Sequence, residues 1–326
     1  MPAGEAVSMV NVNRGQRVMI AAMALALGAA GCSSGSDSGA ARAGGGASAS
    51  QTATATPTSA ATDTAAQQEE FAQLESQFSA TLGVYAIDTG TGQTVTYHAD
   101  TRFAFCSTMK TFAAAALLKQ DSDAQLQQTL HYTSAELVDY SPVTSQHIAT
   151  GMTLESIMTA AIEVSDNTAY NLMLQQIGSP TSLQTILRGL GDSTTNVNRT
   201  EPTVNSATPG DPRDTSTPRA LATDLRTEVL GSALNPTRQA QLTTWLEANT
   251  TGGPYIRASV PAGWKVGDKT GNGDYGTRND IAVLWPSDGG APIVLAVLSH
   301  RGTADANSAD ALLADATKIV LTALAA

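Results

Sequence analysis

One helix-forming segment constrains this chain more than any other. From Thr108 onward the sequence is rich in good helix formers, including the run Ala113–Ala116, so Ser107 is expected at or just inside a helix N-terminus. Positions i and i+3 of a helix lie on the same side, with Cβ atoms about 5–6 Å apart. The Lys110 amine is therefore within reach of the Ser107 hydroxyl. On its own, this S-x-x-K spacing indicates a buried structural helix more often than a reactive site.

The spacing nevertheless offers a definite chemistry. A serine hydroxyl is a weak nucleophile until a neighbouring base takes its proton, and an amine whose pKa is lowered can do so. Backbone N–H groups at the start of a helix can stabilise a developing oxyanion. The segment therefore predicts nucleophilic catalysis if other motifs bring further groups to Ser107 and Lys110.

Composition excludes several other classes of function. The chain has 326 residues, of which 42% are hydrophobic and 14% charged, so it can form a substantial core. A formal net charge of −11 argues against binding to nucleic acid, whose phosphates need clustered Lys and Arg. The four histidines are scattered without metal-ligand spacing. We expect no metal, no cofactor and no nucleic acid.

The N-terminus is typical of an exported protein. Arg14 and Arg17 precede the apolar run Val18–Ala30, which is too short to span a membrane. Residues 1–31 are therefore predicted to be a signal peptide. The small residues before Cys32 are similar to a lipoprotein cleavage box, so we expect lipidation of Cys32; the alternative is an ordinary secretory cleavage nearby.

The remaining chain divides into a tether and a folded part. Residues 32–66 are almost wholly Ser, Gly, Ala and Thr, which predicts a flexible tether. Folded structure is expected to begin near Gln68. Helices and strands are predicted at Glu69–Phe78, Leu82–Asp88, Thr94–Tyr97, Leu154–Val164, Thr168–Ile177, Thr181–Leu190, Ala220–Leu230, Thr237–Glu247, Trp264–Asp268, Arg278–Trp285, Ile293–Ser299 and Ala306–Leu324.

This order of elements predicts an α/β fold with strands at both ends and helices between. The expected architecture is a mixed antiparallel sheet flanked by N- and C-terminal helices, with an inserted all-α domain. The predicted boundaries are 67–98 and 251–326 for the two parts of the α/β domain, and 99–250 for the all-α domain. A pocket is expected where the two meet.

Three further motifs accompany the serine–lysine pair. Ser165-Asp166-Asn167 lies between two predicted helices, and Lys269-Thr270-Gly271 follows the strand predicted at Trp264–Asp268. A polar loop contains R-x-E-P-x-x-N from Arg199 through Glu201 to Asn205, and Asp214 closes it. Each motif alone is compatible with a cap or a turn, but their joint occurrence in this order indicates an active site.

From about Gln68 to Ala326, these motifs resemble class A serine β-lactamases. The resemblance implies hydrolysis of the β-lactam amide through a serine acyl-enzyme, and hence β-lactam antibiotic resistance. Met109 stands where the family more often has Phe, a swap between apolar residues. Some relatives have a disulfide at the residue before the nucleophile; here Cys106 is present but Gly273 occupies the partner position, so that bridge is absent.

The resemblance also implies a role for each motif residue. Ser107 is the nucleophile, Ser165 relays a proton to the leaving nitrogen, and Glu201 activates the deacylating water that Asn205 positions. Either Lys110 or Glu201 is the acylation base, and this choice stays open. Backbone N–H groups of Ser107 and Asn272 hold the oxyanion, and Arg199 with Asp214 forms an ion pair in a loop where Glu201-Pro202 is cis. The residues expected to bind substrate are Tyr140, Asn167, Lys269, Thr270, Gly271, Asn272 and Arg278.

Two other functions remain open at this point. A penicillin-binding D,D-peptidase shares the Ser/Lys, S-D-N and K-T-G motifs but lacks a well-placed base for water, so the Glu201–Asn205 element favours hydrolysis. A catalytically silent surface-binding lipoprotein would be expected to have lost one of the catalytic residues. The expected partner is a small-molecule β-lactam, and the protein is expected to be a secreted or lipid-anchored monomer that touches the membrane only through Cys32.

Overall fold

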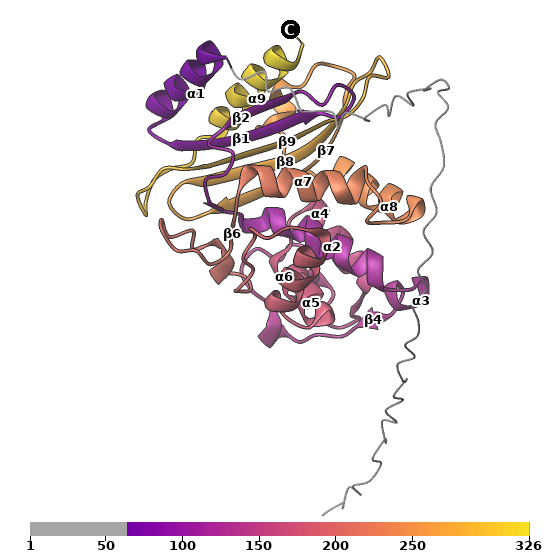
Figure 1. Cartoon of the computed structure of the whole chain (residues 1–326). Coiled ribbons are helices and arrows are strands. Elements are labelled where there is room, and N and C mark those ends of the chain that lie inside the picture. The colour runs from indigo at the N-terminus through magenta and orange to yellow at the C-terminus, as the bar shows by residue number, and fades with distance from the viewer. Residues whose placement is uncertain (1–63, 326) are drawn as a thin grey trace, which may run out of the picture. The chain divides into compact units, whose positions relative to one another are not determined.

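The computed structural model describes residues 64–325, which lie in one compact unit built around a five-stranded sheet. All neighbouring strands are antiparallel, in the order β2-β1-β9-β8-β7. Figure 1 shows α1 (Ala65–Phe78) and α9 (Asp310–Leu324) on one side of the sheet and α7 (Pro218–Val229) on the other, which confirms the predicted fold class. The strands are β1 Thr81–Asp88, β2 Thr94–Tyr97, β7 Lys265–Gly273, β8 Thr277–Trp285 and β9 Ile293–His300.

The sheet is buried on both faces, as the alternation along β1 shows. Leu82 and Val84 belong to the apolar cluster formed with α1 and α9. Tyr85 and Ile87 belong to the cluster on the opposite face, together with the central helices. Because successive side chains of a strand point to opposite faces, a strand covered on both sides is apolar at nearly every position.

The helical part surrounds α2 (Met109–Gln120), whose residues from Met109 to Leu118 are all buried. The small side chains of Ala113–Ala116 let neighbouring helices approach α2 closely. In the part of the chain from 64 to 325, no helix combines the length and apolarity needed to span a bilayer. The other helices and short strands are α3 Asp123–Leu126, α4 Leu154–Glu163, α5 Asn167–Ile177, α6 Pro180–Leu190, α8 Pro236–Glu247, β3 Phe103–Ala104, β4 Thr129–Leu130, β5 Met152–Thr153 and β6 Thr215–Ser216.

The first helix begins earlier than predicted. The sequence predicted a tether up to residue 66, but α1 starts at Ala65. The reason is a capping box, in which the Thr64 side chain accepts from the Gln67 N–H and the Gln67 side chain accepts from the Thr64 N–H. The predicted signal peptide, Cys32 and most of the tether lie outside the described residues.

Strand β7 is longer than predicted, so that Lys269-Thr270-Gly271 lies within it. The sequence predicted a short strand ending at Asp268 with Lys269-Thr270-Gly271 after it. In the structure β7 continues to Gly273 and pairs with β8 throughout, ending at the pair of Gly273 with Thr277. The glycines and Asn272 have low strand propensity, but the ladder with β8 supplies the hydrogen bonds that hold them extended. The motif is therefore part of the sheet.

Helix α7 carries two buried acids on the face that packs into the protein. Asp224 and Glu228 are each 3% exposed, and each has one carboxylate oxygen without a hydrogen-bond partner in the described region. Burial, followed by the charge of Asp192, raises the pKa of Asp224 to about 8. Burial and the neighbouring Asp224 raise the pKa of Glu228 as well. At neutral pH, Asp224 is therefore expected to be largely protonated and to donate to Asp192.

We expect the free energy of unfolding to fall as pH rises from about 4, the ordinary pKa of an Asp carboxyl, to about 8. In this range the folded protein holds a proton on Asp224 that the unfolded chain has released. Asp224→Asn keeps a hydrogen-bond donor without the charge. It should remove part of the decline and raise the unfolding midpoint at pH 9 by at least about 2 °C. Thermal unfolding between pH 5 and 9 measures this effect.

Asp305→Asn is the matched control, because Asp305 is exposed and its substitution should leave the pH dependence unchanged. If the free energy of unfolding of Asp224→Asn fell with pH as much as that of the wild type, the proton responsible for the decline would be bound by other buried acids.

Candidate active site

Ser107 lies in the 3₁₀ turn Cys106–Thr108, which leads directly into α2. This agrees with its predicted position at a helix start. The chain entering the turn is held by Asn279 of β8, whose Nδ2 donates to the carbonyl oxygens of Ala104 (2.7 Å) and Phe105 (3.2 Å). The nucleophile candidate is thereby fixed to the sheet.

Strand β7 passes very close to this turn. A Cβ added to Gly271 would lie 2.6 Å from the Phe105 carbonyl oxygen, nearer than Cβ atoms approach other atoms. Only glycine therefore allows the strand to lie against the turn. The neighbouring residues Thr270 and Asn272 then line the same cavity as Ser107.

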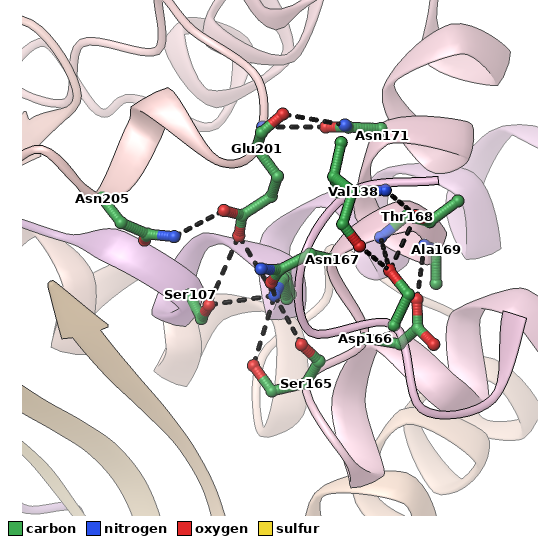
Figure 2. Close-up of polar contacts among 12 residues, drawn as sticks. Ser107, Val138, Ser165, Asp166, Asn167, Thr168, Ala169, Asn171, Glu201 and Asn205 are labelled. Carbon is green, nitrogen blue, oxygen red and sulfur yellow. Dashed lines mark hydrogen bonds and ion pairs between the residues drawn. The ribbon is translucent and has the colours of Figure 1, made fainter. Parts of the chain in front are cut away.

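The Lys110 amine is fully buried at the centre of the site. Burial lowers its pKa, while the Glu201 carboxylate opposes that shift. An ammonium group has three hydrogens, fewer than the acceptors around it, so the amine can exchange hydrogen-bond partners without moving. Figure 2 shows the side chains of Ser107, Ser165 and Glu201 directed toward one another. The contacts of Lys110 Nζ are Ser107 Oγ (2.9 Å), Ser165 O (2.8 Å), Ser165 Oγ (3.2 Å), Asn167 Oδ1 (2.6 Å) and Glu201 Oε1 (3.1 Å).

Ser165 connects two amines. It lies between α4 and α5 with a left-handed backbone (φ 60°). Its Oγ is 3.2 Å from Lys110 Nζ and 3.0 Å from Lys269 Nζ. Burial, and then the charge of Lys110, lower the pKa of Lys269 to about 7. An amine that changes charge near neutral pH can supply or accept a proton through the Ser165 hydroxyl.

Asp166, the middle residue of Ser165-Asp166-Asn167, fixes a segment that forms one wall of the cavity. Asp166 is fully buried, caps α5 through the Ala169 N–H (2.9 Å), and accepts from the N–H groups of Val143 (3.0 Å) and Thr144 (2.9 Å). It thereby fixes the segment that follows Tyr140. The Tyr140 side chain lines the cavity and is 61% exposed.

Glu201 is buried and faces Ser107. Its Oε1 lies 3.5 Å from Ser107 Oγ, and its Oε2 accepts from Asn205 Nδ2 (Figure 2). The backbone of Glu201 is held by Asn171 of α5, which accepts from its N–H (2.8 Å) and donates to its carbonyl (3.0 Å). Asn171 carries no motif that sequence reasoning could have recognised. The Glu201-Pro202 peptide is cis.

The loop that carries Glu201 is tied together by one buried carboxylate. Asp214 is fully buried, forms an ion pair with Arg199, and accepts from the N–H groups of Asn198 (2.8 Å) and Arg199 (3.0 Å). Arg199 also donates to Ser206 Oγ (2.7 Å). The Asp214 carbonyl accepts from the Phe105 N–H (3.1 Å), so the loop is joined directly to the nucleophile segment.

These groups surround a cavity of about 480 Å³. Thr250 and Thr251 were not predicted; they follow α8 in a polar loop, where hydroxyl residues are too common to indicate a site. Within the described region, no group of His, Cys, Asp and Glu side chains could hold a metal ion. The lining residues are Ser107, Tyr140, Ser165, Asn167, Asn205, Thr250, Thr251, Thr270 and Asn272.

Three predicted substrate-binding residues are engaged within the protein. The Lys269 amine is fully buried, is not among the lining residues, and donates to Ser165 Oγ (3.0 Å) and to the Thr270 carbonyl (3.0 Å). Asn167 accepts from Lys110 through Oδ1, and its Nδ2 donates to the Asp139 carbonyl (2.9 Å). Arg278 is not among the lining residues. Its Nε lies 3.2 Å from Asp310 Oδ1, and it pairs across the ladder with Asn272. Arg278 therefore lies beside Asn272 on the neighbouring strand, outside the cavity lining.

Comparison with known proteins identifies what this chain is similar to. The family model described as the beta-lactamase enzyme family matches residues 66–324. A β-lactamase of Amycolatopsis lactamdurans is 54% identical over 266 residues, which is 82% of this chain and 88% of that relative. A Bacillus subtilis β-lactamase is 51% identical over 253 residues, 78% and 82% of the two chains. The solved structure of a class A β-lactamase from Clostridium kluyveri has a TM-score of 0.78 at 46% identity, covering 79% of this chain and 98% of that one.

Replacing Arg199 by Ala should loosen the loop from 199 to 214, because the buried Asp214 carboxylate would lose its counter-charge. We expect proteinase K to cut this loop at least about tenfold faster than in the wild type, because cleavage follows the population of locally opened chain. Mass spectrometry of the fragments locates the cut.

Arg213→Ala serves as the control. Arg213 is 57% exposed, and among residues 64–325 its one ion pair is with the Asp211 carboxylate, so its removal should not change the cleavage rate. Equal rates for Arg199→Ala and wild type would show that the buried pair does not hold the loop.

Proposed function

The chain belongs to the β-lactamase enzyme family and is a class A β-lactamase that hydrolyses the β-lactam amide, and from this premise we propose how its residues perform the reaction. The observation that carries the proposal is the buried Lys110 amine, which lies within hydrogen-bond distance of Ser107, Ser165 and Glu201. Ser107 is the nucleophile that attacks the lactam carbonyl and forms the acyl-enzyme.

We propose Lys110 as the group that takes the Ser107 proton. The 2.9 Å contact between Lys110 Nζ and Ser107 Oγ is shorter than the 3.5 Å between Glu201 Oε1 and Ser107 Oγ. Glu201, 3.1 Å from the amine, can first accept a proton from Lys110 and leave it neutral. Burial favours this exchange, because it replaces a buried ion pair by two neutral groups.

The leaving nitrogen must receive a proton as the lactam bond breaks. Ser165 Oγ is in contact with both Lys110 and Lys269, so it can donate its own proton and regain one from either amine. The oxyanion is assigned to the backbone N–H groups of Ser107 and Asn272. Each such donor typically contributes about 10²–10³ in rate.

After Lys110 has passed the Ser107 proton on through Ser165, Glu201 returns its own proton to the amine 3.1 Å away and is again a carboxylate. Deacylation requires a base that activates water, and Glu201 is assigned this role. It is buried, its backbone is held by Asn171, and its side chain accepts from Asn205. Asn205 Oδ1 has no hydrogen-bond partner in the described region, so it can accept from a water that Glu201 deprotonates. Both groups face Ser107, where the ester forms.

Substrate binding is assigned to the wall formed by β7 and the segments facing it. Lys269, Thr270 and Gly271 lie along the strand, and Lys269 and Thr270 supply charge and a hydroxyl to the substrate carboxylate. Tyr140 forms the outer wall, and Asn167 retains one amide hydrogen for the substrate side chain. Arg278, beside Asn272 on the neighbouring strand, acts through its charge.

A D,D-peptidase would use the same serine and lysine but retain its acyl-enzyme. The position of Glu201 next to Ser107 favours hydrolysis. A silent binding protein is not favoured, because its pocket would not need two buried amines beside a serine hydroxyl.

Enzymes of this family are exported. We further propose that residues 1–31 are removed, that Cys32 carries a lipid anchor, and that 32–66 form a tether to a monomeric enzyme. In the folded part, we propose one domain from 67–98 with 251–326 and a second from 99–250. Labelling of the expressed protein with a radioactive fatty acid, compared with Cys32→Ser, tests the anchor.

Glu201→Gln should accumulate a penicilloyl adduct on Ser107, because the ester forms but water is not activated. General-base catalysis is typically worth about 10²–10⁴ in rate, and deacylation should slow by that factor. Intact-protein mass spectrometry after mixing with penicillin measures the adduct.

Ser107→Ala is the control and should show neither adduct nor turnover. If the wild type retained the adduct as long as Glu201→Gln does, the peptidase mechanism would be correct instead.

Binding of the substrate carboxylate should weaken above neutral pH. Lys269 has its pKa lowered to about 7, so it is charged below that pH and loses its charge above it. The dissociation constant of penicillin for Ser107→Ala should rise by about tenfold between pH 6 and 8.5, the scale of one hydrogen bond to a charged group. Calorimetry measures the dissociation constant at each pH. As the control, the dissociation constant of penicillin methyl ester should not change with pH. A dissociation constant of penicillin that also stayed constant with pH would contradict the role of Lys269.

A further inference from the structure

A chain of hydrogen bonds runs from the interior to the cavity wall along the loop after α8. Asn249 Nδ2 donates to Asp268 Oδ2 (2.7 Å), and Asn249 Oδ1 lies 2.8 Å from Thr251 Oγ1. Thr251 Oγ1 in turn lies 2.5 Å from Thr270 Oγ1. Both threonines line the cavity, whereas Asn249 and Asp268 are buried.

Two separate contacts determine the orientation of the Asn249 side-chain amide. Its Oδ1 lies 3.0 Å from the Thr251 backbone N–H, which can only donate. Its Nδ2 faces Asp268, whose other oxygen is 2.5 Å from Arg257 Nε. A Cβ on Gly252 would lie 1.9 Å from Asp268 Oδ2, so the loop backbone rests directly on this carboxylate and the arrangement is rigid.

The direction of the two hydroxyl protons follows from this orientation. Asn249 Oδ1 accepts, so the single Thr251 hydroxyl proton points to Asn249. Thr251 Oγ1 can then only accept from Thr270, and the Thr270 proton points to Thr251. In the unliganded protein, Thr270 therefore presents lone pairs, not a proton, to the cavity.

We propose that Thr251 is a specificity-determining residue, which draws the Thr270 proton away from the site where the substrate carboxylate binds. The inference rests on the proposed function, in which Thr270 donates to that carboxylate. Binding requires both hydroxyls to reverse: Thr270 turns its proton to the carboxylate, and Thr251 turns its proton to Thr270. The hydrogen bond from Thr251 Oγ1 to Asn249 is lost, while the Thr251 N–H still satisfies Asn249 Oδ1.

This reversal weakens the binding of an anion but not that of a neutral group. To bind, a carboxylate must break one neutral hydrogen bond within the protein. The free energy of such a bond corresponds to about a two- to tenfold change in a binding constant. A substrate whose carboxylate is esterified does not require the Thr270 proton. The Thr251–Asn249 contact therefore reduces the preference of the site for anionic over neutral β-lactams.

Thr251→Val in the Ser107→Ala background tests the inference without turnover. Valine offers no acceptor, so the Thr270 proton is free for the carboxylate. We expect the dissociation constant of penicillin at pH 6 to fall by about two- to tenfold, with that of penicillin methyl ester unchanged, as measured by calorimetry.

Two variants serve as controls. Thr251→Ser retains the hydroxyl and should bind as the parent does. Thr244→Val removes an exposed hydroxyl of α8 that donates to the Ala240 carbonyl (2.9 Å) and does not line the cavity, so it should also leave both constants unchanged.

The outcomes separate the inference from the function on which it rests. If the parent binds penicillin better than its ester and Thr251→Val weakens or does not alter binding of the acid, the inference is wrong. An equal change for acid and ester would overturn it as well. If the parent binds acid and ester equally, the proposed carboxylate site is wrong, and the inference falls with it.

Discussion

The active site depends on placing a lysine amine where no water reaches it. An isolated ammonium group is too costly to bury in a protein interior, so Lys110 must be surrounded by oxygens and by a partner that can take its charge. The oxygens come from Ser107 on its own helix start and from Ser165 and Asn167 between α4 and α5. The counter-charge comes from Glu201. One buried amine thus requires three chain segments to meet.

The same contacts also determine how the pKa of the amine is shifted. Burial disfavours the charged form of Lys110, while Glu201 favours it. Burial and the neighbouring carboxylate thus act on the pKa of Lys110 in opposite directions. Lys269 experiences the same burial and the repulsion of Lys110, and Ser165 Oγ lies between the two amines. The pKa of Lys269 is thereby lowered to about 7, far below that of a lysine in water.

Two residues, Gly271 and Asp214, maintain this geometry. Gly271 lets β7 lie against the nucleophile turn, since any side chain there would meet the Phe105 carbonyl. Asp214 uses its side chain to hold Arg199 and its carbonyl to hold the Phe105 N–H. The loop that carries Glu201 and the segment that carries Ser107 are therefore joined through a single residue, which keeps acid and hydroxyl in register.

The sequence alone determined the fold class, the longer helices and strands to within a few residues, and the spacing of the motifs, because hydrophobic periodicity and motif spacing are local properties of the chain. It did not predict α3 or the two-residue strands β3–β6, which are too short to show a period. It could not determine that Lys269-Thr270-Gly271 lies inside β7, since that depends on pairing with β8. Nor could it identify Asn171, Asn249 or Thr251, which are ordinary polar residues until the fold brings them to partners far along the chain. Only the tertiary structure decided the direction in which the pKa values of the buried amines shift and the direction of the hydroxyl protons, because both are set by burial and by neighbours that are distant in sequence.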